Sequence, residues 1–337
     1  MRFFRRSSRR FFTFALALAA AAGAQAQPPA LLNSSYDVSR EFFKDINAAF
    51  VQHYKQTTGQ DIRIDQSHGG SSAQARAVAD GLAADVVTMN TAADVAFLAE
   101  RGVVAADWQQ QFPQGAAPTA STIIFLVRQG NPKNIRDWAD LARPDVKVVT
   151  VNPKTSGNGR LAYLAAWGQV RAAGGSDEQA REFVAKLYKN VPALARSGRD
   201  ATGLFLQRNL GDVLLTAESE ALAAQREFGA GRAQAVYPAI SIEAHNPVAV
   251  VPRTVDKKGT GEAARAYLQF LYSPQAQATA ARHGLRPRVP AERERHASAF
   301  APLRLFDAQE FFGPPAQAQK THFGDGGVFD QLYQPGR

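Results

Sequence analysis

Three short polar segments carry the residues best suited to chemistry, and each lies where a helix is expected to begin. They read SSYD (34–37), SHGGSS (67–72) and NPKTSGNG (152–159). The start of a helix leaves backbone N–H groups unpaired at the positive end of the helix dipole, and serine hydroxyls add further donors. Together these segments predict a site for a small anion that needs no cationic side chain.

The same residue types also suit two other roles. Ser, Asn and Gly are common helix caps, and most capping loops bind only their own helix. The other alternative is an exported α/β hydrolase or phosphatase that uses Ser71 or Ser156. Against it, GGSSA (69–73) lacks the last glycine of a nucleophile elbow, and no two of the six histidines have the spacing of zinc ligands. We therefore expect a protein that is not an enzyme and has neither a metal nor another cofactor.

Strands and helices alternate along the chain and place these polar segments. Strands are expected at 30–35, 61–65, 85–90, 121–127 and 146–151, and later at 212–216, 234–240 and 246–252. The run STIIFLV (121–127) has no alternation of apolar and polar residues after its first two positions, which is typical of a strand buried on both faces. The alternation predicts α/β layers with largely parallel sheets, and such sheets bind ligands beyond the carboxyl ends of their strands. The polar segments follow strands at those ends.

The first 26 residues are expected to be a secretory signal peptide. Five arginines precede an apolar stretch (11–22), and the Ala24-Gln25-Ala26 cleavage pattern follows it, which predicts a periplasmic protein. Both the general secretory route and the twin-arginine route fit these residues. Without the five arginines, 34 Lys and Arg stand against 30 Asp and Glu, so the net charge falls from +9 to +4.

Composition limits the remaining function classes. The 337 residues are enough for two domains, and 45% hydrophobic with 20% charged residues indicates a globular chain. The chain after residue 26 has no basic block with interleaved aromatic residues, so nucleic acid is not an expected partner. It also has no second apolar run long enough for membrane insertion. With no cysteine, the chain has no disulfide, and stability must come from the cores.

Several longer motifs, in order along the chain, give a specific resemblance. They are LLNSSYDVSREFF, QSHGGS, ADVVT, NPKTSGNGR with YLAAWG, GDVLLTAESEAL, FLYSPQAQ and THFGDGGVFDQLY. In these motifs the chain resembles the periplasmic sulfate- and thiosulfate-binding proteins of ABC importers. The resemblance implies a monomer that delivers its anion to a membrane ABC permease. It also implies an α/β, two-lobed type II periplasmic-binding-protein fold, with mixed, mostly parallel sheets flanked by helices.

The resemblance also implies lobe boundaries and site residues. The first lobe is expected at 27–118 and 244–337 and the second at 119–243, with the chain crossing near 117–123 and 237–243. The anion is expected to be held by backbone N–H groups and a few side-chain donors, contributed by Asp37, Ser71, Ser156, Gly157, Asn158 and Gly198. For Asp37 the donor is its amide, and its carboxylate is expected to cap its own helix.

Two positions depart from the pattern of the family. Asn158 stands where some members have a second glycine, and Ala217 stands where relatives commonly have a tryptophan whose indole N–H reaches the anion. The room at Ala217 leaves sulfate, thiosulfate and a larger organosulfonate all open. A ferric-ion site on the same fold would need adjacent tyrosines and carboxylates, whereas only Tyr36 lies in these segments.

Overall fold

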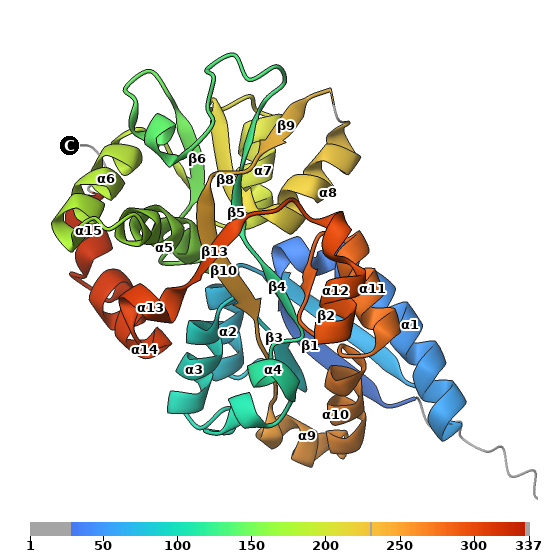
Figure 1. The fold of residues 1–337 in the computed structure, drawn as a ribbon. Helices are drawn as coiled ribbons and strands as arrows, with labels where there is room; N and C mark the ends of the chain where they lie inside the picture. Colours follow the sequence, from blue (N-terminus) through green and yellow to red (C-terminus); the bar gives the residue numbers. More distant parts are fainter. Residues whose placement is uncertain (1–27, 230, 334–337) are drawn as a thin grey trace, which may run out of the picture.

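The computed structural model describes residues 28–229 and 231–333, so the expected signal peptide lies outside the described residues. The described chain forms the expected α/β fold of two lobes, each with its own sheet and apolar core, joined by a smaller sheet (Figure 1). None of the helices in this part of the chain has the length and apolarity needed to cross a bilayer.

The first lobe is built around a sheet with strand order β11-β3-β1-β2. Its strands are β1 (Ala30–Tyr36), β2 (Arg63–Gly69), β3 (Val86–Thr88) and β11 (Val248–Val250). Its helices are α1 (Arg40–Thr58), α2 (Ser71–Ala79), α3 (Ala92–Glu100), α4 (Pro113–Ala116), α9 (Pro252–Lys258), α10 (Gly261–Phe270), α11 (Pro274–Arg282) and α12 (Pro290–Arg295), with a 3-10 turn at Trp108–Gln110 and another at Ala297–Ala299. β1 runs parallel to β2 and β3, and β11 runs antiparallel to β3.

Helix α1 shows why the sequence folds this way. Phe42, Ile46, Phe50 and Tyr54 recur every four residues, so they lie on one face of the helix and pack into the core of the first lobe. The helix ends at Gly59, whose φ of 74° is a left-handed conformation that glycine adopts without strain.

The second lobe is built around a sheet with strand order β7-β6-β8-β5-β9. Its strands are β5 (Ile123–Arg128), β6 (Val148–Val151), β7 (Leu194–Ala195), β8 (Val213–Ala217) and β9 (Ala233–Val236). Its helices are α5 (Gly157–Ala172), α6 (Asp177–Lys189), α7 (Gly198–Leu206) and α8 (Glu218–Phe228), with a 3-10 helix at Trp138–Ala142. Ile123 and Phe125 enter one core cluster, and Ile124 and Leu126 enter another on the opposite face. The prediction of a strand buried on both faces is confirmed.

The two lobes are connected by a sheet with strand order β12-β4-β10-β13. It contains β4 (Thr119–Ser121), β10 (Ile240–Asn246), β12 (Arg286–Pro287) and β13 (Arg304–Asp307). The expected strand at 121–127 is interrupted at Thr122, where the chain leaves β4 and enters β5. Because β5 enters its sheet from this connection, it runs antiparallel to its neighbours β8 and β9. The second lobe is consequently less parallel than the sequence predicted.

The C-terminal segment, expected in the first lobe as part of 244–337, packs its aromatic residues on the second lobe and also lies against α3 of the first lobe. It contains α13 (Ala308–Phe312), α14 (Pro315–Ala318), the π-helical turn Gln319–Phe323 and α15 (Val328–Leu332), which lie below and beside α5 in Figure 1. Phe312, Phe323 and Phe329 join the core cluster that contains Tyr163 of α5. The Tyr163 and Phe323 ring centroids are 5.1 Å apart. Burial of these aromatic rings on α5 explains the placement.

Candidate functional site

The starts of α2, α5 and α7 meet at the interface between the two lobes, which we call the seam. Gly70, which precedes α2 in the first lobe, lies against the loop before α5 in the second lobe. A β-carbon placed on Gly70 would lie 2.8 Å from the Thr155 carbonyl oxygen and 3.5 Å from the Ser156 β-carbon. A β-carbon on Gly198, the first residue of α7, would lie 2.5 Å from Val38 Cγ1 of the first lobe. The lobes are therefore in close contact.

All six residues expected in the anion site lie at or beside this seam. Ser71 is the first residue of α2, and Ser156 is the N-cap of α5. Gly157 and Asn158 begin α5, and Gly198 begins α7. Asp37 follows β1 directly and begins a short 3-10 helix (Asp37–Ser39) that leads into α1. Each of the six residues is buried. The structure thus brings together residues that are up to 161 positions apart, from Asp37 to Gly198.

The hydroxyl of Ser156 differs from an ordinary capping hydroxyl. Ser176 and Ser197, the N-caps of α6 and α7, accept hydrogen bonds from their own helices through their side chains. Ser156 is an N-cap in extended conformation, yet its side chain makes no capping bond. Its hydroxyl is therefore not committed to the helix that it precedes. This feature weakens the alternative in which the loop serves only as a cap.

The hydroxyl of Ser71 is used within the first lobe. It accepts a hydrogen bond from the Asn90 N–H at 3.2 Å and lies 3.5 Å from Met89 Sδ, toward which it donates. These contacts fix the Ser71 side chain at the start of α2. A hydroxyl oxygen can accept one bond while its hydrogen turns toward another acceptor, so both contacts leave the hydroxyl able to reorient.

The Asp37 carboxylate, expected to cap its own helix, reaches the start of a helix in the second lobe. Its Oδ2 accepts a hydrogen bond from the Arg199 N–H at 2.9 Å, and its own backbone N–H also acts to lower its pKa against the effect of burial. Arg199 is the second residue of α7, so a carboxylate of the first lobe occupies the start of a helix in the second. The helix dipole stabilises a negative charge at this position.

A buried acid–base cluster lies next to this contact. Glu220 Oε1 accepts hydrogen bonds from the Thr202 hydroxyl at 2.6 Å and from Arg199 Nη1 at 3.3 Å. Burial raises the pKa of Glu220 to about 7, although the charge of Arg199 opposes the shift. Burial also raises the pKa of Asp37, against the hydrogen bond from the Arg199 amide. The seam therefore contains two carboxyl groups that resist ionisation beside one guanidinium.

A buried ion pair also joins the lobes. Arg160 Nη1 of α5 lies 2.9 Å from Asp94 Oδ1 of α3, and their side chains are only 8% and 3% exposed. Arg160 Nε also donates to the Pro153 carbonyl at 3.1 Å, in the loop that leads to Ser156. The guanidinium thus links the first lobe to the anion-binding segment expected from the sequence.

The sequence analysis missed Asn90 and Glu220, although both lie at the seam. Asn90 lies two residues beyond the end of β3, whereas the sequence pattern placed it as the last residue of the expected strand 85–90. Glu220 is the third residue of α8, where an acidic residue is ordinary for a helix start. Its burial was therefore not readable from the sequence.

Ala217, the second departure from the family pattern, is the N-cap of α8 and is buried. Its backbone is tied to the crossing between the lobes, because Ala217 pairs with Ile123 and the Glu218 N–H donates to the Thr122 carbonyl at 2.8 Å. Glu218 also forms a two-bond ion pair with Arg286 of β12, at 2.7 and 2.9 Å. Since the Ala217 methyl group is already surrounded, a larger side chain there would have to displace its neighbours.

Features of an enzyme are not assembled at this seam. In residues 28–229 and 231–333, neither Ser71 nor Ser156 is hydrogen-bonded to a histidine or a carboxylate. The same residues contain no group of three or more His, Cys, Asp or Glu placed to hold a metal ion. The nucleophile–base contact required by the hydrolase alternative is thus not seen in the described chain.

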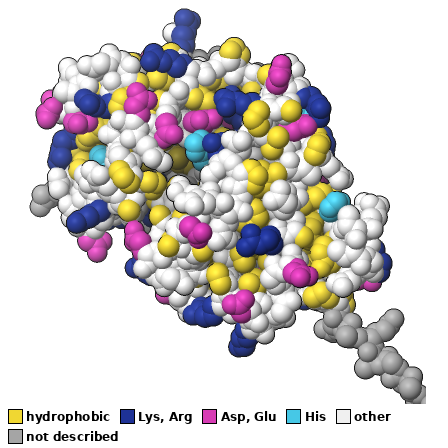
Figure 2. Space-filling model, turned by 60° about the horizontal axis from the view of Figure 1, so that its bottom comes forward, with side chains coloured by type: hydrophobic (Ala, Val, Ile, Leu, Met, Phe, Trp, Pro, Cys, Tyr) yellow, Lys and Arg dark blue, Asp and Glu magenta, His cyan; other side chains and the backbone are white. Residues whose placement is uncertain are grey.

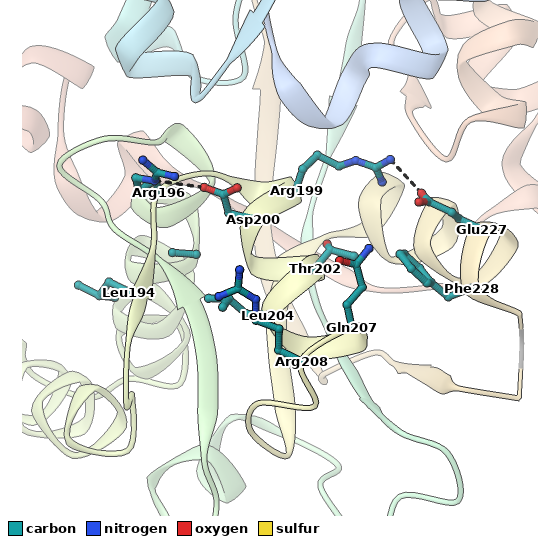
Figure 3. Close-up of a pocket in the computed structure, with 12 residues that line it drawn as sticks. Leu194, Arg196, Arg199, Asp200, Thr202, Leu204, Gln207, Arg208, Glu227 and Phe228 are labelled. Carbon is teal, nitrogen blue, oxygen red and sulfur yellow. Dashed lines mark hydrogen bonds and ion pairs between the residues drawn. The ribbon is translucent and has the colours of Figure 1, made fainter.

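Two pockets lie near the seam without containing the six residues. One, of about 500 Å³, is lined by β7, α7 and α8, all from the second lobe. Figure 3 shows Arg199 at its rim, with its side chain directed toward Glu227. The other, of about 90 Å³, lies between the lobes and is lined by Asn90, Arg160 and His245 among others. In Figure 2 the surface between the lobes is hollowed, with acidic and histidine side chains nearby.

The family model and the known proteins that resemble this chain are all described as binding proteins. Residues 35–286 match the family model described as bacterial extracellular solute-binding protein. A thiosulfate-binding protein of Pseudomonas aeruginosa is 51% identical, over 92% of this chain and 93% of its own. A sulfate-binding protein of Escherichia coli is 48% identical, over 95% and 97%. Among solved structures, the sulfate-binding protein SubI of Mycobacterium tuberculosis is 33% identical with a TM-score of 0.77, over 91% of this chain and all of that one.

Proposed function

The chain belongs to the bacterial extracellular solute-binding proteins, and we propose that it captures sulfate or thiosulfate between its lobes and delivers it to an ABC permease. The observation that carries the proposal is the meeting of helix starts from both lobes at one buried seam. The relatives named as sulfate- and thiosulfate-binding proteins support the choice of anion.

The proposed donors are neutral and come from both lobes. The first lobe contributes the amide of Asp37 and the amide or hydroxyl of Ser71. The second lobe contributes the Ser156 hydroxyl and the amides of Gly157, Asn158 and Gly198. Sulfate and thiosulfate carry two negative charges and no proton at neutral pH, so these donors suit them. Hydrogen phosphate would direct its own proton at one of these donors.

Capture is proposed to occur by closure of the lobes around the anion. The anion contacts both lobes only when they are shut, so its binding energy favours the shut form over the open form. The proposed hinge contains Thr122 and the segment 237–243 that leads into β10. On the packing described above, the second lobe is proposed to comprise 119–243 together with the C-terminal segment from Phe306 onward.

The proposed setting is the periplasm of a bacterial cell. Export would depend on the first 26 residues, by the general secretory or the twin-arginine route. The exported protein would act as a monomer that binds its anion, closes, and presents the shut form to the permease. We propose that the protein carries out no chemical conversion of its ligand.

Thermal unfolding with a panel of anions tests the proposal. Residues 27–337 would be heated with sulfate, thiosulfate, molybdate, phosphate or taurine. A ligand that binds only the folded chain stabilises it by RT ln(1 + [L]/Kd), so at one hundred times Kd the gain is about 2.7 kcal/mol. We expect sulfate or thiosulfate to raise Tm strongly and phosphate to raise it little. No rise with any sulfur oxyanion would contradict the proposal.

A pair of serine variants tests the location of the site. Ser156→Ala is expected to weaken binding about tenfold, because it removes one of several donors to a charged ligand. Ser176→Ala is the matched control, since Ser176 is the N-cap of α6 in the same lobe and its hydroxyl bonds Gln179. The control is expected to lower Tm and leave Kd unchanged. Equal Kd values for the two variants would place the site elsewhere.

A further inference from the structure

Two asparagine side chains meet across the seam between the lobes. Asn90 lies between β3 and α3 in the first lobe, and Asn158 is the second residue of α5 in the second. Asn90 Nδ2 donates a hydrogen bond to Asn158 Oδ1 at 2.8 Å. Both residues are buried, with 4% and 3% of their surfaces exposed. This contact joins the lobes through neutral groups inside the proposed anion site.

One hydrogen bond between two side-chain amides leaves the oxygen of one and the nitrogen of the other unused. Here the remaining groups are Asn158 Nδ2 and Asn90 Oδ1, and neither has a hydrogen-bond partner within the described residues. Buried polar atoms are rarely left in this condition in folded proteins. Exchanging oxygen and nitrogen in both side chains would free the Asn90 nitrogen and the Asn158 oxygen instead, so the direction of the bond decides which residue presents a donor.

The remaining Asn158 donor lies among the amides of the proposed site. A β-carbon placed on Gly198 would lie 2.6 Å from Asn158 Nδ2, so this nitrogen faces the start of α7. On the other side, Asn90 Oδ1 lies against Gly157, where a β-carbon would overlap it. The amide pair is therefore placed between two of the residues proposed to donate backbone hydrogen bonds.

We propose that Asn158 binds the anion through its side chain as well as its backbone, and that Asn90 is a positioning residue that fixes the Asn158 amide. The inference rests on the proposed function, since it adds a donor to the same site. An anion would favour the orientation in which Asn158 presents Nδ2, and the bond from Asn90 Nδ2 to Oδ1 holds that orientation. A glycine at position 158 would supply only the backbone amide.

The Asn158 side chain also affects how the site selects sulfate and thiosulfate over phosphate. Asn158 Nδ2 is a further neutral donor, so it favours ligands that are fully deprotonated and accept hydrogen bonds on every side. Sulfate and thiosulfate are such ligands, and inorganic phosphate near neutral pH is not. The Asn158 side chain therefore contributes to the preference for sulfur oxyanions, beyond what the shared backbone donors provide.

Calorimetry with sulfate and with thiosulfate tests the inference on three variants of the exported chain. Asn158→Ala removes the side-chain donor and keeps the backbone amide, and we expect it to weaken binding of the preferred anion about thirtyfold. Asn90→Ala removes only the positioning contact and is expected to weaken it about fivefold. In the double variant, the loss is expected to equal that of Asn158→Ala alone, because Asn90 has nothing left to position.

The outcomes separate a ligand donor from a contact that merely joins the lobes. If the two asparagines only hold the lobes together, Asn90→Ala and Asn158→Ala would weaken binding equally. That result would overturn the inference, and so would unchanged binding in Asn158→Ala. If the unaltered chain binds neither anion, the proposed function itself fails. Asn190→Ala is the matched control, since Asn190 is a buried asparagine of the second lobe that bonds the Leu141 and Arg143 carbonyls. It is expected to lower Tm without changing Kd.

Discussion

At the scale of single residues, Glu220 is a buried carboxyl group whose pKa is raised. It is 1% exposed, its Oε1 is bonded by Thr202 and Arg199, and its Oε2 has no hydrogen-bond partner in the part of the chain described. Asp37 adds a second buried carboxyl group nearby, and its charge also raises the pKa of Glu220. Arg199 is shared, since it also pairs with Glu227 at 2.9 Å. The Arg199 guanidinium therefore pairs with two acidic groups, Glu220 and Glu227, while its backbone N–H binds Asp37.

This position predicts a pH-dependent stability that Glu220→Gln removes. With a pKa of about 7 in the folded chain against an ordinary value of 4.5, Glu220 keeps its proton longer when folded than when unfolded. Stability therefore falls as pH rises between about 4.5 and 7, and the full penalty, on the order of 3 kcal/mol, persists above that range. Glutamine imitates the neutral acid, so the variant is expected to have a higher Tm than the unaltered chain at pH 8 and a similar Tm at pH 5.

Glu227→Gln provides the control for this measurement. Glu227 binds the same guanidinium but its side chain is 47% exposed, so its removal changes the charge without relieving a buried carboxylate. We expect no gain in Tm at pH 8 for the control. An equal gain in both variants would mean that a general reduction of negative charge, rather than burial of Glu220, explains the effect.

At the scale of elements, the site depends on helices that start at the seam. The helix starts were predictable, because a strand, a polar segment and an apolar helical pattern follow one another three times in the sequence. Position alone therefore indicated the segments that contain Ser71, Ser156 and Gly157, and the family resemblance singled out these residues. The sequence also suggested that Asp37 caps its own helix, whereas the Asp37 carboxylate accepts a hydrogen bond from the Arg199 N–H of α7, 162 residues away.

Other element-level features were beyond the reach of the sequence. The break at Thr122 comes directly before the apolar residues 123–127, and the hydrophobic pattern did not separate β4 from β5, although the family resemblance placed a crossing near 117–123. The short β13 and the C-terminal helices carry few periodic residues, and their attachment to α5 depends on long-range aromatic packing. The Asn90–Asn158 contact likewise joins residues of different lobes, which local pattern does not relate.

The pair between α3 and α5 gives a prediction at this scale. Arg160→Met keeps the length of the side chain and leaves Asp94 buried without its partner. Breaking a buried ion pair in this way costs about 3–5 kcal/mol. Since the partners belong to different lobes, the cost falls on the shut form, and the anion is expected to bind at least about a hundredfold more weakly by calorimetry. Tm without ligand is expected to change little.

Arg171→Met is a matched control on the same helix. Arg171 lies in the last turn of α5 and pairs with Asp177 of the same lobe, where its side chain is 32% exposed. This control is expected to leave Kd unchanged. A fall in Tm with normal binding in Arg160→Met would show instead that the ion pair supports the fold whether or not the lobes are shut.

At the scale of the whole molecule, the two cores are separate and the seam between them is polar. The core cluster of the first lobe contains no residue of the second-lobe sheet. The two clusters around the second-lobe sheet contain no residue of the first-lobe core. Apolar packing therefore stabilises each lobe, while polar contacts connect them. A molecule organised in this way can open at the hinge without exposing either core, as a binding protein of this kind requires.

This organisation makes Gly157 the place where closure can be blocked without damaging either lobe. A β-carbon there would overlap Asn90 Oδ1 and lie 2.8 Å from Thr91 Cγ2, both in the opposite lobe. Gly157→Ala keeps the backbone N–H but prevents the seam from shutting. We expect at least a hundredfold loss of anion affinity, an unchanged Tm without ligand, and, by small-angle X-ray scattering, no decrease of the radius of gyration when saturating sulfate or thiosulfate is added.

Gly203→Ala is the control that isolates the effect of position. Gly203 lies within α7 of the same lobe, and the nearest atom to an added β-carbon is the flexible Gln207 Oε1 at 3.7 Å. Alanine in a helix interior is more stable than glycine by about 0.5–1 kcal/mol, so Tm is expected to rise while affinity and ligand-induced compaction stay normal. If Gly157→Ala bound the anion as well as Gly203→Ala does, the shut seam would not be the ligand-bound arrangement. The anion would then be held by one lobe, where the helix starts of the other could not contribute.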